Sequence, residues 1–228
     1  MELSEGDDHR GPPPRSPDRL KVLQWNVLGL RGKRSELLQA IVEEDLDLVL
    51  LQETLEPEHV EWRLAGYTVH ALPRDGDGHR GCMMVVWSSL PHQRIPDPVH
   101  CGLGVEVMAV LLQLPGLSLT VYNVYCSPRR QLEAGELLSL AAHTNVLVAG
   151  DFNAHHPLLQ SVSPTNAAGL HLAAMLEEVP HIALLNNGEP THLRRTAASP
   201  PTLRGTGSSR STPARCPAHS AGRRGLLS

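Results

Sequence analysis

The first third of the chain has an apolar pattern that indicates a strand, a helix and a second strand. Residues 20–26 form a short apolar run that ends in polar residues, as strands do. Residues 45–53 are almost continuously aliphatic and bounded by acids, which is typical of a strand covered on both faces. Between them, residues 35–44 repeat apolar side chains at helical spacing. The residues on that face are Leu37, Leu38, Ile41 and Val42. The pattern therefore predicts a β-α-β beginning.

The middle of the chain contains consecutive strand-like runs without intervening helices. Pro115 and Gly116 separate the last two runs and predict a hairpin turn. Consecutive strands of this kind pair antiparallel. The four predicted strands are residues 67–71, 82–87, 105–114 and 117–125.

The remaining pattern predicts a helix over 132–143, a strand over 145–149, a helix over 166–178 and a strand over 182–185. The mixed order of strands and helices favours two packed sheets with outer helices. After Ile182 the sequence contains no Val, Ile, Met, Phe, Tyr or Trp, so this part lacks the residues that build a core. We predict a disordered segment over residues 1–19, one domain over 20–198, and a disordered low-complexity tail over 199–228.

Composition narrows the class of protein. The chain has 228 residues, of which 41% are hydrophobic and 19% charged, as in a soluble globular domain. Its polar, proline-containing beginning carries no apolar run suited to a secretory signal or a membrane helix. The four cysteines form no C-x-x-C pair, which favours reduced thiols over a zinc site. We expect an intracellular protein, nuclear or cytoplasmic, with no membrane partner.

The net charge of −4 hides an uneven distribution. Seven arginines and no acids follow Glu189, so residues 1–189 carry −4 − 7 = −11. Nucleic-acid binding through a basic patch depends on phosphate neutralisation by Lys and Arg. An acidic body of this kind would need a cation as intermediary to hold a phosphate substrate.

Polar side chains at strand ends carry the candidate chemistry. The string Gly150 to His156 (GDFNAHH) follows an apolar strand directly, where polar groups project into a crevice. Asp151 can orient or deprotonate a water, and the Asn153 amide can donate to a phosphate oxygen without adding charge. The same string can also be a strand-ending turn, because Gly, Asp and Asn are common turn residues.

Three further candidates end other predicted strands. Asn26 and Glu53 supply oxygen ligands of the type that Mg²⁺ prefers, and the hydroxyl of Tyr125 can reach a phosphate oxygen. Each has a structural alternative: an acid at a strand end is often merely solvated, and Tyr125 fits a half-buried strand aromatic. Their joint occurrence in order is what indicates a site.

The strings QWN, QE, NVYCSP, GDFNAHH and PTH, in this order, resemble the endonuclease domain of non-LTR retrotransposons. That domain is a member of the endonuclease/exonuclease/phosphatase family, which includes abasic-site endonucleases and pancreatic deoxyribonuclease. The resemblance runs from about Leu20 to about His192, and GDFNAHH is its most specific part.

The resemblance implies a four-layer α/β/β/α sandwich of the pancreatic deoxyribonuclease type and hydrolysis of DNA phosphodiesters with Mg²⁺, or Mn²⁺ in its place. Asn26 and Glu53 would lie at the metal, Tyr125 and Asn153 would bind the phosphate, and Asp151 with Asn153 would position or activate the water. His155 and His156 match the string too, but nothing chemical requires them there, and we treat them as loop residues.

The family pattern breaks off after His192. The family continues with a Ser-x-x-Asp-Leu strand and a terminal Ser-Asp-His, and neither occurs here. The resemblance therefore implies a fold that lacks its last strands and a site that lacks its last Asp and His. A change of reading frame near residue 209 is one hypothesis for this departure; an alternative exon is another.

Three functions stay open at this point. The first is a retrotransposon-type, magnesium-dependent DNA endonuclease. The second is a catalytically inactive, transposon-derived remnant or binding module, which the missing terminal motifs favour. The third is a phosphoesterase acting on a non-DNA substrate, because the same fold hosts several substrates.

Overall fold

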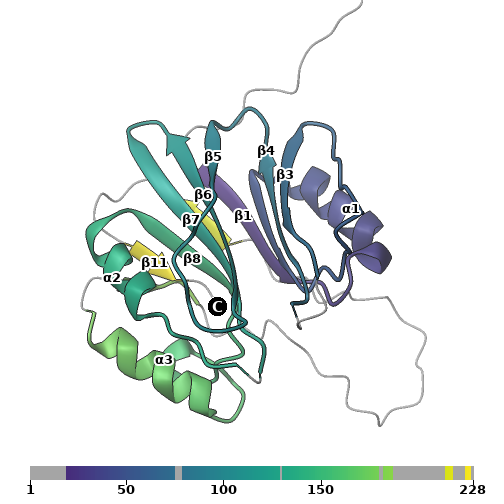
Figure 1. Ribbon diagram of the computed structural model, residues 1–228. Coiled ribbons are helices and arrows are strands. Elements are labelled where there is room, and N and C mark those ends of the chain that lie inside the picture. The colour runs from purple at the N-terminus through teal and green to yellow at the C-terminus, as the bar shows by residue number, and fades with distance from the viewer. Residues whose placement is uncertain are drawn as a thin grey trace, which may run out of the picture.

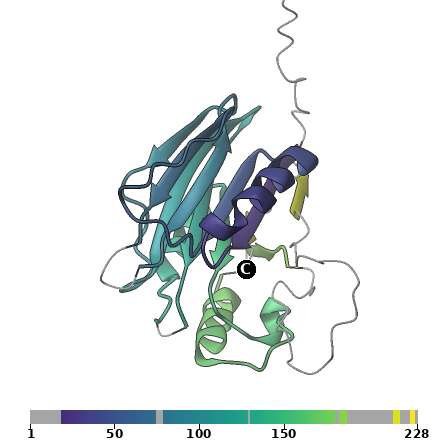
Figure 2. The same ribbon diagram turned by 90° about the vertical axis from the view of Figure 1, so that its right-hand side faces the viewer.

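The computed structural model describes residues 19–74, 79–128, 130–179 and 182–186, and the backbone of residues 214–217 and 224–226. Two sheets pack face to face, with α1 (Arg34–Glu44) outside one and α2 (Gly135–His143) and α3 (Ala167–Glu177) outside the other, as Figures 1 and 2 show. The architecture is therefore an α/β sandwich in which helices cover the outer face of each sheet.

The first sheet has the strand order β10-β1-β2-β4-β3. β1 (Arg19–Asn26) pairs parallel with β2 (Leu48–Gln52), as the predicted β-α-β unit requires, with a short 3-10 helix (Arg31–Lys33) and α1 between them. β4 (Cys82–Trp87) runs antiparallel to both β2 and β3 (Tyr67–Leu72). Every residue of β2 is buried, in keeping with its unbroken aliphatic sequence.

The second sheet has the strand order β5-β6-β7-β8-β11-β9. β6 (Glu106–Leu114) and β7 (Leu117–Tyr125) form the predicted antiparallel hairpin, and β7 pairs parallel with β8 (Val146–Asp151). The remaining elements are β5 (His92–Ile95), the 3-10 helix Pro157–Leu159 and β9 (Ile182–Leu184).

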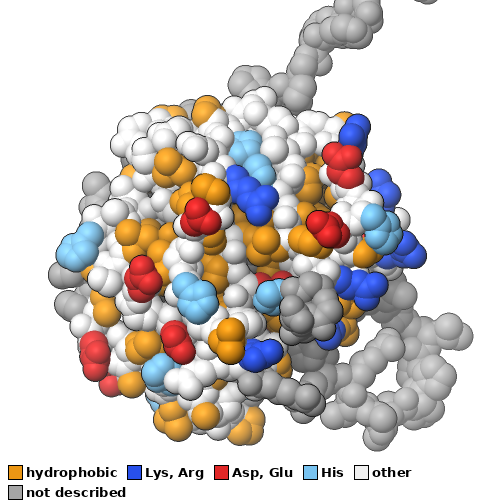
Figure 3. Space-filling view, in the orientation of Figure 1, with side chains coloured by type: hydrophobic (Ala, Val, Ile, Leu, Met, Phe, Trp, Pro, Cys, Tyr) orange, Lys and Arg blue, Asp and Glu red, His pale blue; other side chains and the backbone are white. Residues whose placement is uncertain are grey.

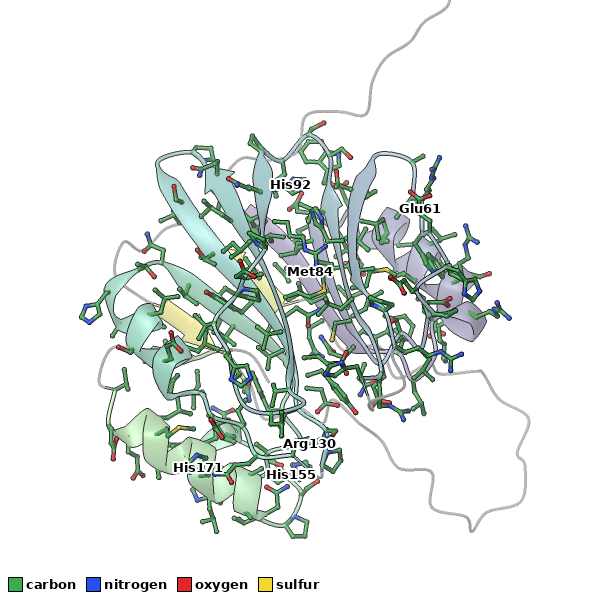
Figure 4. The ribbon with its side chains drawn as sticks, in the orientation of Figure 1. Glu61, Met84, His92, Arg130, His155 and His171 are labelled. Atoms are coloured by element: carbon green, nitrogen blue, oxygen red, sulfur yellow. The ribbon has the colours of Figure 1, made fainter. Side chains whose placement is uncertain are left out.

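Three apolar clusters hold the layers together. One lies between α1 and the first sheet, one between the two sheets, and one between the second sheet and α2 and α3. Met84 belongs to the middle cluster and lies between the sheets in Figure 4. Because both faces of each sheet are covered, the central strands are apolar on both sides.

Some sequence predictions differ from the structure. Leu37 and Ile41 are buried on the face of α1 that packs against the sheet, but Val42 is 79% exposed because it lies on the opposite face of the helix. The strand β5 was not predicted, since its sequence His-Gln-Arg-Ile is mostly polar and suits an edge strand. α2 begins at Gly135, three residues later than predicted.

Two short strands lie within the predicted tail. β10 (Ala214–Pro217) pairs antiparallel with β1, and β11 (Arg224–Leu226) pairs parallel with β8 and β9. The edges of β1 and β8 present backbone donors and acceptors, which any extended segment can satisfy irrespective of its side chains. Apolar periodicity therefore gave no sign of these strands. The other residues of 199–228, and residues 1–18, lie outside the described residues.

Within the described residues, no helix is long and apolar enough to cross a membrane. Cys82, Cys101 and Cys126 are buried free thiols. Burial raises the pKa of Cys101 to about 12 and that of Cys126 to about 11. These thiols are therefore protonated and unreactive near neutral pH.

A pair of buried amides joins the two sheets at the ends of their central strands. Gln52 of β2 donates from Nε2 to Oδ1 of Asn123 in β7 at 2.6 Å. Asn123 donates in turn to the backbone carbonyls of Leu51 and Met83, at 3.0 and 3.1 Å. Both side chains are fully buried, so these hydrogen bonds are not exchanged with water.

Replacing Asn123 with Leu should lower the free energy of unfolding by about 1–3 kcal/mol, because the Gln52 amide and two carbonyls lose their partner inside the core. Urea denaturation measures the loss. In a double-mutant cycle, Gln52→Leu with Asn123→Leu should cost less than the sum of the single changes. Strict additivity would mean that the two amides are not coupled.

His70 of β3 packs across the sheets against His92 of β5. Their rings meet edge to face, with centroids 5.4 Å apart, and Nε2 of His70 is buried without a hydrogen-bond partner among the described residues. Burial lowers the pKa of His70 below its ordinary value of 6.5, and His92 and Arg94 act in the same direction. Folding therefore favours the neutral imidazole.

The unfolded chain binds a proton at His70 as pH falls through about 6.5, whereas the folded chain resists it, so stability should fall below that pH. His70→Phe should reduce this loss, measured as the difference between unfolding free energies at pH 7.5 and pH 5.5. His171→Gln on the exposed face of α3 is the matched control. Equal pH dependence in His70→Phe and the native chain would contradict the assignment.

Candidate active site

The site lies where the ends of four parallel-paired strands meet. Asn26 is the last residue of β1 and Glu53 follows the last residue of β2, while Tyr125 and Asp151 end β7 and β8. Asn26 pairs in register with Gln52, and Tyr125 with Asp151. Because the two sheets pack face to face, both pairs of strand ends face each other across one edge of the sandwich.

Asn26 bridges the two carboxylates of the site. Its Nδ2 donates to Oε1 of Glu53 and to Oδ2 of Asp151, each at 2.8 Å. Asp151 belongs to the second sheet and Asn26 to the first, so the bridge crosses between the sheets. The amide thus holds two negative groups close together without neutralising their charge.

Tyr125 completes this network from the second sheet. Its hydroxyl donates to Oε1 of Glu53 at 3.0 Å, and its side chain is buried. Burial first, and then the charge of Glu53, raise the pKa of Tyr125 well above its ordinary value. The hydroxyl therefore stays protonated and acts as a hydrogen-bond donor near neutral pH.

Asn153 joins the site through its backbone. Its N–H donates to Oδ1 of Asp151 at 3.0 Å, whereas its side-chain Nδ2 donates to the carbonyl of Cys126, also at 3.0 Å. Four of the five predicted site residues therefore share a side-chain network. The amide of Asn153 ties the β8 loop to the loop that follows β7.

The backbone at the site has an unusual conformation. Four non-glycine residues there have positive φ: Leu28 (45°), Glu53 (51°), Leu55 (56°) and Asn153 (48°). Such residues are uncommon and cost of order 1 kcal/mol or more each, and they cluster at functional sites. The turns after β1, β2 and β8 therefore adopt a strained backbone that orients the side chains of the site.

Gly150 allows Asp151 to come close to β7. A Cβ at this position would lie 1.8 Å from the carbonyl oxygen of Val124, so no other residue fits without moving backbone. The glycine of the Gly-Asp-x-Asn string is therefore required for the close approach of β7 and β8, which brings Asp151 beside Tyr125.

Two charged residues of the site were not singled out by the sequence. Arg80 donates from Nε to Oε2 of Glu53 at 2.5 Å. Glu106, at the start of β6, is buried and accepts the backbone N–H groups of Arg80 and Gly81, at 2.7 and 2.8 Å. Burial raises the pKa of Glu106, and these two hydrogen bonds oppose the rise. Glu106 is the only acid in the largely apolar run 105–114, and this isolated charge was the available sequence signal for its role.

The two histidines of the GDFNAHH string support loops. His155 lies beside α3, at the opposite end of the sandwich from His92 in Figure 4. Its Nδ1 lies 3.0 Å from Oγ of Ser161, and its backbone N–H donates to Asn166, the residue that caps α3. His156 accepts the N–H of Leu158 at the 3-10 helix. Neither contact involves the carboxylates.

The donor set fits a magnesium ion of the kind that keeps most of its waters. Among the described residues, no three His, Cys, Asp or Glu side chains converge as metal ligands. Two carboxylates, which are hard oxygen donors, are nevertheless gathered around the amide nitrogen of Asn26. Mg²⁺ is usually bound by one or two carboxylates, waters and substrate phosphate.

Figure 3 shows one face of the molecule, which carries charged side chains of both signs. On the face in Figure 3, acidic, basic and histidine side chains are interspersed among apolar ones.

Solved structures share this architecture. The endonuclease domain of TRAS1, a telomere-specific non-LTR retrotransposon, superposes with a TM-score of 0.54 at 20% identity, covering 71% of this chain and 72% of that domain. AP endonuclease LMAP from Leishmania major gives 0.52 at 16% identity, covering 72% of this chain and 67% of LMAP. At these identities the likeness concerns the fold.

Sequence relatives are transposon proteins of Drosophila melanogaster. The chain is 29% identical over 178 residues to the RNA-directed DNA polymerase from mobile element jockey. It is 26% identical over 178 residues to the probable RNA-directed DNA polymerase from transposon X-element. The match covers 75% of this chain but 19% of each relative. The family model described as Endonuclease/Exonuclease/phosphatase family matches residues 23–224, and the chain belongs to that family.

Proposed function

We propose that the chain is a magnesium-dependent phosphodiesterase that cleaves DNA, as a retrotransposon-type endonuclease domain. The observation that carries the proposal is the bridge from Asn26 to Glu53 and Asp151, which gathers two carboxylates at the meeting point of four strand ends. Two carboxylates held close together suit a cation and an attacking water together.

Asp151 is the proposed proton acceptor. Its two oxygens are held by the Asn153 N–H and the Asn26 amide, so its orientation is fixed by both sheets. In the proposed step, a water oxygen bonds to phosphorus, its proton passes to Asp151, and the bond from phosphorus to the leaving oxygen breaks. The leaving oxygen departs as an alkoxide and takes a proton from solvent water. Holding the water and phosphate in line accounts for much of the rate in such reactions.

Tyr125 and Asn153 are the proposed phosphate ligands. The Tyr125 hydroxyl stays protonated because burial and Glu53 raise its pKa, so it can donate to a phosphate oxygen when its single hydrogen turns away from Glu53. The Nδ2 group of Asn153 uses one hydrogen for the Cys126 carbonyl and has a second to donate. Both donors are uncharged.

Glu53 and Asn26 are the residues that would hold Mg²⁺ or Mn²⁺. The bound ion would neutralise charge on the phosphate and lower the pKa of a bound water. The acidic balance of residues 1–189, −11 from the sequence, supports a role for a cation in bringing a polyanion to this site.

DNA as the substrate is supported by relatives. The similar solved domain is an endonuclease of a non-LTR retrotransposon, and the sequence relatives are transposon polymerases. The chain spans about a fifth of the length of those relatives, so the proposal concerns this domain and not their polymerase activity.

A catalytically inactive remnant or binding module is the second candidate. The specific observation in its favour is that no Asp or Glu follows Glu189 in the sequence. We therefore propose that the Ser-x-x-Asp-Leu and terminal Ser-Asp-His motifs of the family, whose Asp and His complete its site, have no counterpart in this chain. Residues that act as one site are strongly non-additive, and losing one commonly costs about a thousandfold or more.

Nicking of supercoiled plasmid by the purified protein, with and without Mg²⁺, distinguishes the two candidates. We expect magnesium-dependent nicking that falls at least about a thousandfold in Glu53→Gln and Asp151→Asn, because each change removes a carboxylate of the site while keeping its size. Glu61→Gln, which removes an exposed carboxylate paired with Arg63, is the matched control and should nick as the native chain does.

Two results would contradict the hydrolytic proposal. If the native protein and both variants are equally inert while circular dichroism shows them folded, the hypothesis of an inactive remnant or binding module replaces the hydrolytic proposal. If all of them nick equally, the activity does not arise from this site. Product ends from active samples, analysed on denaturing gels, would separate endonuclease cleavage from trimming of existing ends.

A further inference from the structure

Protein groups occupy both acceptor positions of Oε1 of Glu53 and one of the two on Oε2. Oε1 accepts from Asn26 at 2.8 Å and from Tyr125 at 3.0 Å, and Oε2 accepts from Arg80 at 2.5 Å. The side chain of Glu53 is 11% exposed, and that of Arg80 is 40% exposed. A cation that uses Glu53 must therefore bind at Oε2, beside the Arg80 guanidinium, whose like charge opposes it.

The backbone of Arg80 is fixed, so competition moves its side chain and not its loop. Its N–H is held by Glu106 at 2.7 Å, and its carbonyl accepts the N–H of Leu55 at 2.8 Å. The next residue, Gly81, is bonded to Glu106 and to the backbone of Thr54. From this anchored position, a long and partly exposed side chain can swing while its Cα stays at the site.

We propose that Arg80 is an exchangeable counter-ion: it holds Glu53 while no metal is bound, and it transfers to a substrate phosphate oxygen when Mg²⁺ takes Glu53. The inference rests on the proposed function, because it treats Glu53 as the metal ligand. It adds a substrate-binding residue and a coupling between metal and phosphate. The exchange involves no covalent change and no proton transfer.

The net charge of the site favours metal binding first and phosphate binding second. Glu53, Asp151 and Arg80 together carry one net negative charge, which attracts Mg²⁺. With Mg²⁺ bound, the group carries one net positive charge, which a phosphodiester neutralises. Guanidinium groups bind phosphate oxygens with well-directed, charge-assisted hydrogen bonds, so Arg80 has a suitable partner after it leaves Glu53.

Calorimetric titration of Mg²⁺ into the protein, without DNA, tests the first half. Arg80→Gln removes the charge that competes for Glu53, so we expect its Kd for Mg²⁺ to be about tenfold lower than that of the native chain, the size expected for one charge-assisted hydrogen bond. Arg63→Gln, whose arginine is exposed and pairs with exposed Glu61, should leave the Kd unchanged.

Binding of a short DNA duplex with phosphorothioate linkages, measured by fluorescence anisotropy at saturating Mg²⁺, tests the second half. Arg80→Gln should weaken binding about tenfold, whereas Arg63→Gln should not. The two variants thus separate a local role of Arg80 from a general loss of positive charge.

The inference is overturned if Arg80→Gln, folded by circular dichroism, binds Mg²⁺ no more tightly than the native chain, or if neither protein binds Mg²⁺. It is also overturned if the variant binds the duplex as well as the native chain does. A protein that nicks no plasmid but shows tighter Mg²⁺ binding and weaker duplex binding in Arg80→Gln would refute the proposed hydrolysis and leave the counter-ion exchange standing.

Discussion

The hydrogen bond between Gln52 and Asn123 fixes how the two sheets meet. Apolar contacts between sheets favour close packing but allow sliding, whereas a buried amide pair has one satisfactory geometry. Gln52 directly precedes Glu53, and Asn123 stands two residues before Tyr125 on the same strand. The pair therefore sets the distance between Tyr125 and Glu53. The dimensions of the site thus depend on this contact in the core.

The charged groups at the site depend on one another. Asn26 holds Glu53 and Asp151 together, Tyr125 and Arg80 donate to Glu53, and Glu106 holds the backbone from which Arg80 extends. Buried or half-buried carboxylates are costly unless they are paired or accept hydrogen bonds. Strands of both sheets contribute donors, so the site also contributes to the contact between the layers.

Much of the fold could be predicted from apolar periodicity, because strands such as Cys82–Trp87 and the hairpin over 106–125 are long and clearly patterned. β5 and β10 could not, because edge strands form through backbone pairing that side chains do not encode. Asn26, Glu53, Tyr125 and Asp151 were predicted as a group because each ends an apolar strand. Arg80 and Glu106 were missed, since their roles arise from contacts between segments distant in sequence.

The left-handed backbone at Glu53 and Asn153 sets stability and activity against each other. Glycine would relieve the strain at either position. At Glu53 it would also remove a nearly buried carboxylate that is paired with Arg80. For the fold, that gain is offset, because Asn26, Tyr125 and Arg80 would lose the acceptor that Glu53 supplies, and the loop after β8 would lose the bond from Asn153 to Cys126. In a lineage where cleavage of a phosphodiester no longer matters, these two residues would thus be retained only for the hydrogen bonds that they make between segments.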